Sequence, residues 1–194
     1  IFPSLYTAGG YSWGLVTFQF HPQYAQAGEP GYGKFYSVHV EVPTPDGSGA
    51  RLPVNTHFGG FDTMGYSTTT VQVSPGANAS TAVHCVLVEW QDNDVSDYVF
   101  KGTARELLRT ENNTRIHPLG DLLFNPLATS PAHPDWENLY LAHGDGADGE
   151  NADATKHANP QSLATLGGKI LRIHVADPDG GGPPRYGRPA GKPL

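Results

Sequence analysis

Apolar and polar side chains alternate with a period of two over long parts of this chain. The alternation is clearest in KFYSVHVEV, residues 34–42, where Tyr36, Val38, Val40 and Val42 share one face. A period of two predicts a half-buried strand. The run GLVTFQFHPQY, residues 14–24, also begins as a strand and ends at His-Pro, because proline disfavours continuation. We expect these two runs to pair as a hairpin with a long connection.

The run TAVHCVLVEW, residues 81–90, is apolar on both faces, which predicts a covered central strand. Short apolar runs separated by Pro, Gly and Asp predict four further strands. A single short helical turn is expected over 160–166, and no helix of ordinary length is required. The four strands are expected at 104–110, 120–124, 138–143 and 169–175.

Residues 43–79 break this regularity, because they are rich in Pro, Gly, Asn and Thr. Their strongest patterns are RLPVNTHF and TTTVQVSP, which we interpret as a weak hairpin inside a long insertion loop. Loops of this length are uncommon in compact domains unless they are functional.

The composition fits strands joined by many turns, with 24 Gly, 17 Pro and only 16% charged residues in 194. The fold class expected is therefore all-β, in one domain. The net charge is −7 and Lys and Arg form no cluster, which argues against nucleic acid or an anionic membrane as a partner. No apolar run reaches 18 residues, so no membrane-spanning helix is expected.

Two strand pairs share a pattern of apolar strand, Pro or Asp turn and aromatic strand: GLVTFQFHPQY with GKFYSVHV, and GDLLFNPL with ENLYLAHG. Each pair has the appearance of the inner strands of a β-propeller blade. The chain would supply about three blades, and both of its ends look truncated, so residues 1–194 are expected to form part of a propeller.

Cysteine and histidine chemistry is sparse. Cys85 is the only cysteine, lies in an apolar run and is expected to be a buried hydrophobe. The nine histidines include no HxH or HExxH spacing, so no metal site is signalled. His39 and His84 lie within predicted strands and are expected to be packed or hydrogen-bonded.

The most informative stretch runs from His117 to Ile173. His117 stands just before one predicted strand, and Asp145 lies in a Gly-Asp-Gly loop just after another. Asp145 is either a turn residue, because Asp before Gly caps its own turn, or a site residue. Lys169 and Arg172 differ by three positions on a strand and face opposite sides, which favours structural charges over cofactor ligands.

Four segments in this order resemble the glucose/sorbosone dehydrogenase family of soluble quinoproteins. GLVTFQFHPQY with KFYSVHV is similar to that family's GLLGFAFHPDF and following YIYIS strand. HPLGDLLF, at 117–124, is similar to its H-x-x-G-x-L-x-F. NLYLAHGDG and PQSLATLGGKILRI are similar to its LYxxxGD and AQxxxxLxGKxLRI.

The resemblance implies a six-bladed propeller that uses pyrroloquinoline quinone (PQQ), held with calcium, to oxidise the C1 hydroxyl of aldose sugars. His117 matches the family's general base, and imidazole can accept a proton near neutrality. Asp145, Glu150 and Asn151 match the sugar-contacting loop. The resemblance also implies an electron acceptor, a periplasmic or secreted location, and cofactor ligands downstream of the last segment.

The sequence leaves an alternative open. Ile116 stands where the enzymes carry an acidic residue, and Ser12 or Trp13 stands where they carry a glutamine. These departures favour a non-catalytic propeller that binds carbohydrate or protein, as hedgehog-interacting relatives do. A third possibility is that these residues have no activity alone.

Overall fold

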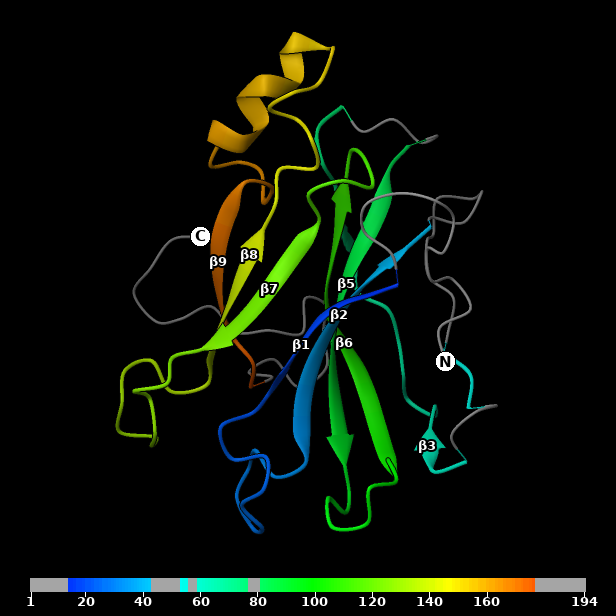
Figure 1. The fold of residues 1–194 in the computed structure, drawn as a ribbon, viewed down its shortest axis with the longest axis vertical. Coiled ribbons are helices and arrows are strands. Elements are labelled where there is room, and N and C mark those ends of the chain that lie inside the picture. The colour runs from blue at the N-terminus through cyan, green and yellow to red at the C-terminus, as the bar shows by residue number, and fades with distance from the viewer. Residues whose placement is uncertain (1–13, 43–52, 56–58, 77–80, 177–194) are drawn as a thin grey trace.

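The computed structural model describes residues 14–42, 53–55, 59–76 and 81–176, and these form two β-sheets (Figure 1). The first sheet contains β1 (Leu15–Phe20), β2 (Lys34–Glu41), β5 (Val83–Asp92) and β6 (Gly102–Asn112), each antiparallel to the next. The second contains β7 (Leu119–Phe124), β8 (Asn138–His143) and β9 (Lys169–His174), also antiparallel. The all-β prediction is confirmed.

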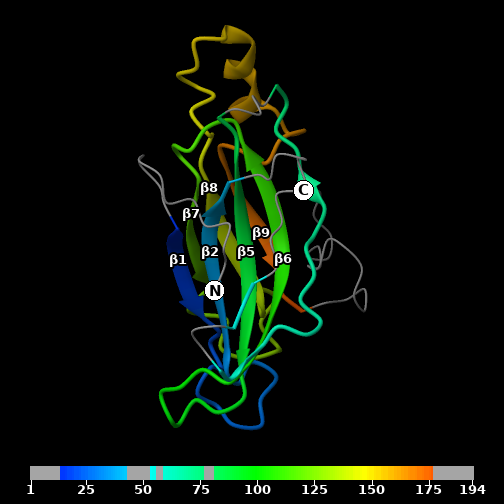
Figure 2. The same ribbon diagram turned by 90° about the vertical axis from the view of Figure 1, so that its right-hand side faces the viewer.

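The two sheets pack face to face, and the main core lies between them (Figure 2). The alternation in β2 puts Tyr36, Val38 and Val40 on this inner face, as predicted, and all three are fully buried. Leu139 and Leu141 meet them from β8. At one side β1 lies next to β7, so the first strands of the two sheets are neighbours. Where about three blades were expected, the described residues form two sheets.

The hairpin of β1 and β2 and the central position of β5 are both confirmed. Nearly every residue of β5 is buried, because β5 is covered on both faces. The inter-sheet core covers one face. The other face, which includes Val88 and Trp90, packs against Phe61 and Tyr66 in a smaller cluster.

Only part of the weak hairpin expected within 43–79 lies among the described residues, so the pairing of its two runs stays a prediction. β3 (Phe61–Asp62) and β4 (Val71–Gln72) do not pair with each other, and each runs parallel to β6. β6 would otherwise be an open edge with unpaired backbone groups, and the segment 61–72 covers it. The predicted strand RLPVNTHF lies mostly outside the described residues.

The helical turn expected at 160–166 begins earlier, as the 3₁₀ helix η1 (Ala154–Gln161). Asp153 fixes its start, because the Asp153 carboxylate accepts hydrogen bonds from Thr155 N at 3.1 Å and from Thr155 Oγ1 at 2.6 Å. η1 lies at the end of the molecule opposite the β1–β2 and β5–β6 loops (Figure 1).

A buried histidine makes the fold sensitive to acid. The His21 side chain packs edge-on against Phe124 and Trp136, and His21 Nδ1 accepts a hydrogen bond from Gln23 N at 3.0 Å. Burial, and then the nearby Lys34 charge, lower the pKa of His21 from 6.5 to about 4. The unfolded chain therefore takes up this proton first as the pH falls, and stability is lost between pH 6.5 and 4.

Replacing His21 with asparagine tests this sensitivity. Asparagine can still accept the hydrogen bond from Gln23 N as an Asx turn, but it does not titrate. The pKa difference at His21 corresponds to about 3 kcal/mol. His21→Asn should therefore reduce the loss of unfolding free energy between pH 6.5 and 4 by about that amount, measured by urea denaturation. An unchanged pH dependence would show that folding does not lower the pKa of His21.

Candidate functional site

The candidate site lies where β7 begins and β8 ends. Leu119 in β7 is paired with His143 in β8. His117 precedes Leu119 by two residues, and Asp145 follows His143 by two. Because the strands are antiparallel, these two side chains arrive at the same edge of the sheet, where the sequence placed them.

His117 and Asp145 are in direct contact. His117 Nδ1 lies 2.9 Å from Asp145 Oδ1. The His117 side chain is 53% exposed and that of Asp145 is 24% exposed. If Nδ1 carries the proton and donates it to the carboxylate, Nε2 is left as a bare acceptor on the exposed side of the ring. The pair has the geometry of a base and the group that orients it.

The Asp145 carboxylate is held by its own loop. Ala147 N donates to Asp145 Oδ1 at 3.0 Å, and Gly149 N donates to Asp145 Oδ2 at 3.0 Å. Partial burial alone would raise the pKa of Asp145, but the hydrogen bonds from Gly149 N, His117 and Ala147 N together lower it below its ordinary value. Asp145 therefore stays ionised and both caps its turn and contacts His117, so the two roles considered for it are combined.

The backbone at this edge is strained both before β7 and in the loop after β8. His117 has φ of 50° and Ala147 has φ of 64°, in the left-handed region that non-glycine residues seldom adopt. The carbonyl oxygen of His117 accepts hydrogen bonds from Gly146 N and Asn112 Nδ2, each at 3.2 Å. Such outliers persist where the surroundings enforce them, and they concentrate at functional sites.

The end of β8 is anchored from inside the protein. His143 is 4% exposed, with Nδ1 2.7 Å from Gly144 O and Nε2 2.8 Å from Thr110 Oγ1. Burial lowers the pKa of His143, so the neutral ring donates through Nδ1 and accepts from Thr110 through Nε2. This arrangement fixes the peptide just before Asp145.

The other predicted site residues are not brought to His117 by any contact among the described residues. Glu150 is exposed. Asn151 Oδ1 accepts from Asp153 N at 3.0 Å, which is a turn contact. Ile116 is half-buried, and Ile116 N donates to Thr114 Oγ1. The carboxylate that the resemblance places just before the histidine is absent here, and Asp145 supplies one from the loop that follows the neighbouring strand.

Lys169 and Arg172 have structural partners, as expected. Lys169 Nζ donates to the carbonyl oxygens of Asn159, Pro160 and Gly167, which closes the loop between η1 and β9. Arg172 NH1 lies 3.6 Å from Asp135 Oδ1 at the other end of the sheet. Neither is directed at the His117 site.

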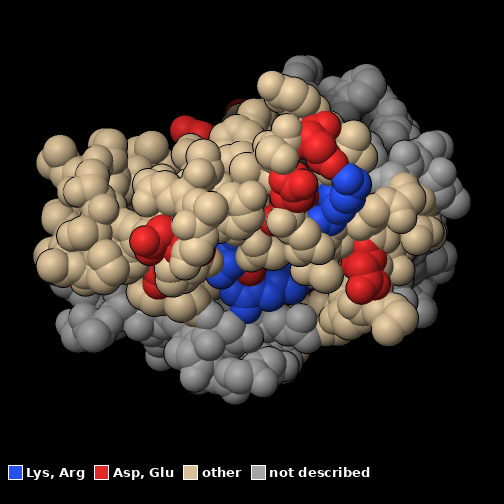
Figure 3. Space-filling model, turned by 90° about the horizontal axis from the view of Figure 1, so that it is seen from below, with Lys and Arg blue, Asp and Glu red and all other residues tan. Residues whose placement is uncertain are grey.

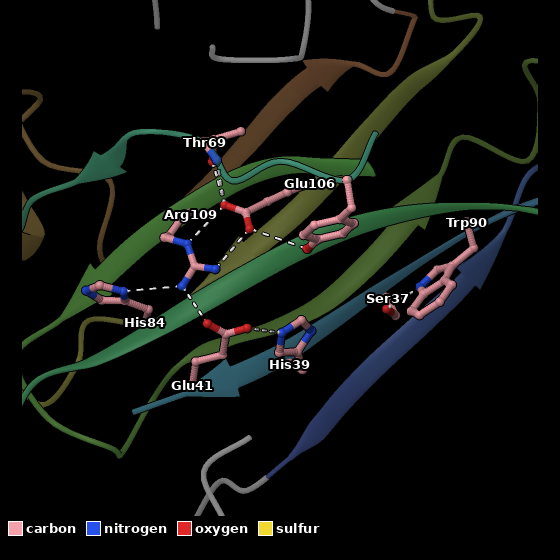
Figure 4. Close-up of polar contacts among 9 residues, drawn as sticks. Ser37, His39, Glu41, Thr69, His84, Trp90, Glu106 and Arg109 are labelled. Atoms are coloured by element: carbon pink, nitrogen blue, oxygen red, sulfur yellow. Dashed lines mark hydrogen bonds and ion pairs between the residues drawn. The ribbon is translucent and has the colours of Figure 1, made fainter. Parts of the chain in front are cut away.

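A second polar cluster is buried on the outer face of the first sheet (Figure 4). Arg109 is 1% exposed and donates to Glu41 Oε2 at 2.7 Å and to Glu106 Oε1 and Oε2 at 3.0 and 2.9 Å. Glu106 also accepts hydrogen bonds from Thr69 N and Thr69 Oγ1. The cluster therefore attaches the segment after β3 to the sheet.

Both strand histidines belong to this cluster, as expected of packed or hydrogen-bonded residues. His39 Nε2 lies 2.8 Å from Glu41 Oε1. His84 Nδ1 lies 3.3 Å from Arg109 NH1, and burial followed by the Arg109 charge lowers the pKa of His84 to about 4. The neutral His84 ring thus accepts from Arg109. The cluster is closed off from solvent and has a structural role.

Cys85 is fully buried, as predicted, and burial raises its pKa to about 11. A thiol with so high a pKa is a poor nucleophile at neutral pH. Asn112, which opens the Asn-Asn-Thr sequon at 112–114, is 2% exposed, so its side chain is not accessible to modification in the folded state.

Charges are intermixed on the face seen from the end opposite η1 (Figure 3). Acidic and basic side chains lie close to one another there, and no broad area of one sign is visible. Some charges are paired across strands, such as Arg105 Nε with Glu89 Oε1 at 2.6 Å. This face does not have the character of a nucleic-acid surface. Within the described part of the chain, no helix has the length and apolarity needed to cross a membrane.

Comparison with known proteins gives no relative. No family model, no curated protein and no solved structure matches this chain.

Proposed function

We propose that this chain is part of a sugar dehydrogenase of the glucose/sorbosone type, in which His117 takes the proton of the C1 hydroxyl of an aldose. The observation that carries the proposal is the 2.9 Å contact between His117 Nδ1 and Asp145 Oδ1, on a histidine whose side chain is 53% exposed. Four sequence segments in the order of that family support it.

The pair suits removal of a hydroxyl proton. An alcohol loses a proton from oxygen as a hydride leaves its carbon, so a base must stand against the hydroxyl. Asp145 holds the proton on Nδ1, keeps Nε2 bare, and stabilises the imidazolium that forms when Nε2 accepts the proton. PQQ, in the family that the chain resembles, is the group that accepts the hydride.

The described residues supply the base but no set of ligands for the cofactor. They include no group of three or more His, Cys, Asp or Glu side chains able to hold a metal ion. The basic side chains Arg105, Arg109, Lys169 and Arg172 all contact protein oxygens. If the protein binds PQQ and calcium, the residues that hold them lie outside the described part of the chain.

The strand order supports a propeller. β1, β2, β5 and β6 follow one another as four antiparallel neighbours, as in a propeller blade, and the short β3 and β4 extend this sheet beyond β6. β7, β8 and β9 repeat the pattern with three strands, and β7 lies beside β1. Successive blades stack in this way around a propeller axis, first strand beside first strand.

The alternative is a non-catalytic propeller that binds carbohydrate or protein. It is favoured by exposed apolar side chains along β1, where Leu15, Phe18 and Phe20 are 61%, 56% and 45% exposed. Clustered exposed apolar side chains are typical of interaction sites. Ile116 beside His117 favours the same alternative.

Kinetics on His117 variants decide between the two. With the full-length protein reconstituted with calcium and PQQ, aldose-dependent dye reduction should fall by about 10²–10⁴ in kcat in His117→Gln, because the base is lost. His174→Gln is the matched control. His174 Nε2 lies 3.8 Å from Glu137 Oε2 at the opposite end of the same sheet, and its loss should leave the rate unchanged.

If wild type oxidises aldoses and His117→Gln is equally fast, the assignment of the base is wrong. If the reconstituted wild type oxidises no aldose but binds an oligosaccharide or a protein, the alternative replaces the dehydrogenase.

A further inference from the structure

We infer that Asp148 is a positioning residue, which fixes the loop that carries Asp145 and through it the orientation of the His117 ring. The kinetic consequence of this inference rests on the proposed function. The structural consequence does not, because the contact between Asp145 and His117 exists whatever reaction the site performs.

Asp148 joins three segments of the chain inside the protein. It is 2% exposed and lies in the loop between β8 and η1. Asp148 Oδ1 accepts a hydrogen bond from Asn113 Nδ2, just beyond the end of β6. Asp148 Oδ2 accepts one from Asn159 Nδ2, in η1, at 2.7 Å. One buried carboxylate thus ties the loop to the first sheet and to the 3₁₀ helix.

The residues that hold Asp145 are the immediate neighbours of Asp148. Ala147 N and Gly149 N donate to the two oxygens of the Asp145 carboxylate. Asp148 N itself donates to Asp145 O at 3.1 Å. When the Asp148 side chain is fixed, the amides on both sides of it are fixed too, and these amides determine where the Asp145 carboxylate points.

The Asp148 carboxylate accepts from two amide donors at once. Asn159 Nδ2 also donates to Pro75 O at 3.1 Å, so this amide cannot turn over without losing that contact. An alanine at position 148 would leave both donors without their acceptor. In a buried site, such a loss is costly.

A reciprocal exchange of Asp148 and Asn113 tests the inference. Asp148→Ala removes the acceptor of Asn113 and Asn159, and Asn113→Asp sets two carboxylates face to face. The double variant combines Asp148→Asn with Asn113→Asp. In the double variant, the new amide at position 148 donates to the new carboxylate at position 113 and still accepts from Asn159. The single variants should disturb the site, and the double variant should restore it. Asp153→Asn, at the exposed start of η1, is the control from the same loop.

The readout is the ¹⁵N spectrum of the His117 ring, in protein labelled at histidine and assigned with His117→Gln. Wild type, Asp153→Asn and the double variant should show Nδ1 protonated and Nε2 bare. Asp148→Ala and Asn113→Asp should show a mixture of the two tautomers. Their kcat should fall by up to about 10²-fold with an altered pH profile, as expected for a misplaced catalytic group.

The inference is overturned if Asp148→Ala leaves the His117 ring signals as in wild type. It is also overturned if the double variant is as disturbed as the single ones, and this arm remains informative should a single variant fail to fold. If the ring signals respond as expected while wild type oxidises no aldose, the positioning role stands and the proposed function fails.

Discussion

Replacing Arg109 with methionine is expected to lower the free energy of unfolding by about 3–5 kcal/mol, measured by urea denaturation at pH 7. Methionine fills much of the volume but removes the positive charge. Glu41 and Glu106, which are fully buried, would then face each other without their shared partner. An uncompensated buried charge is among the most destabilising changes that a single substitution can make.

The Arg109 charge is also what keeps its neighbours in their present protonation states. Burial would raise the pKa of Glu41, but His39 and Arg109 outweigh burial and lower it. Without Arg109, Glu41 should take up a proton at higher pH than in wild type. Thr69 N donates to Glu106 Oε1 at 2.9 Å, so the segment after β3 should be less firmly attached to the sheet when the cluster is disrupted.

Arg105→Met is the matched control for Arg109. Arg105 lies on the same strand and pairs with Glu89, but its side chain is 23% exposed, so water can partly replace it and its loss should cost less than that of Arg109. Adding Glu41→Gln and Glu106→Gln to Arg109→Met should recover part of the loss, because no buried charge is then left unpaired. Equal effects at Arg105 and Arg109 would contradict the buried ion cluster.

Gly144→Ala is expected to cost about 1–3 kcal/mol of stability and to separate His117 from Asp145. A β-carbon at Gly144 would lie 2.2 Å from the carbonyl oxygen of His117 and 2.9 Å from that of Pro118. Both are backbone atoms of the segment that leads into β7, so this segment and the end of β8 must move apart at the site. Thermal unfolding measures the first effect, and the His117 ring spectrum measures the second.

Gly120→Ala is the control for the Gly144 variant. Gly120 lies in β7, and a β-carbon there meets nothing closer than Pro118 O at 3.7 Å. Gly120→Ala should keep or slightly raise stability, because alanine has less freedom to lose on folding. A Gly144 variant as stable as this control would mean that the two strands do not approach as closely as described.

The strands could be predicted because their side chains follow a period of two or are continuously apolar. The alternation in 34–42 gave the buried face of β2, and the apolar run at 81–90 gave the central strand β5. The segment 61–72 could not be placed in this way. Its partner is β6, some distance along the chain, and its attachment depends on a hydrogen bond from Thr69 to Glu106.

The candidate site could be located from sequence but not completed. His117 and the Gly-Asp-Gly loop were expected on one rim, and antiparallel register puts them there. The contact between them requires the loop to turn back at Ala147, which has a positive φ that its residue type does not signal. Asp148 and the Arg109 cluster were not predicted, for a related reason. The partners of a single carboxylate or guanidinium are set by the tertiary fold, and the sequence pattern does not show them.

The central claim is that Asp145 holds His117 with its proton on Nδ1. The most direct test is the ¹⁵N spectrum of the His117 ring, above the pH at which the imidazole is protonated. The account predicts a protonated Nδ1 and a bare Nε2 in wild type, and loss of that preference in Asp145→Ala. A ring protonated on Nε2 in wild type, or the same spectrum in both proteins, would contradict the account.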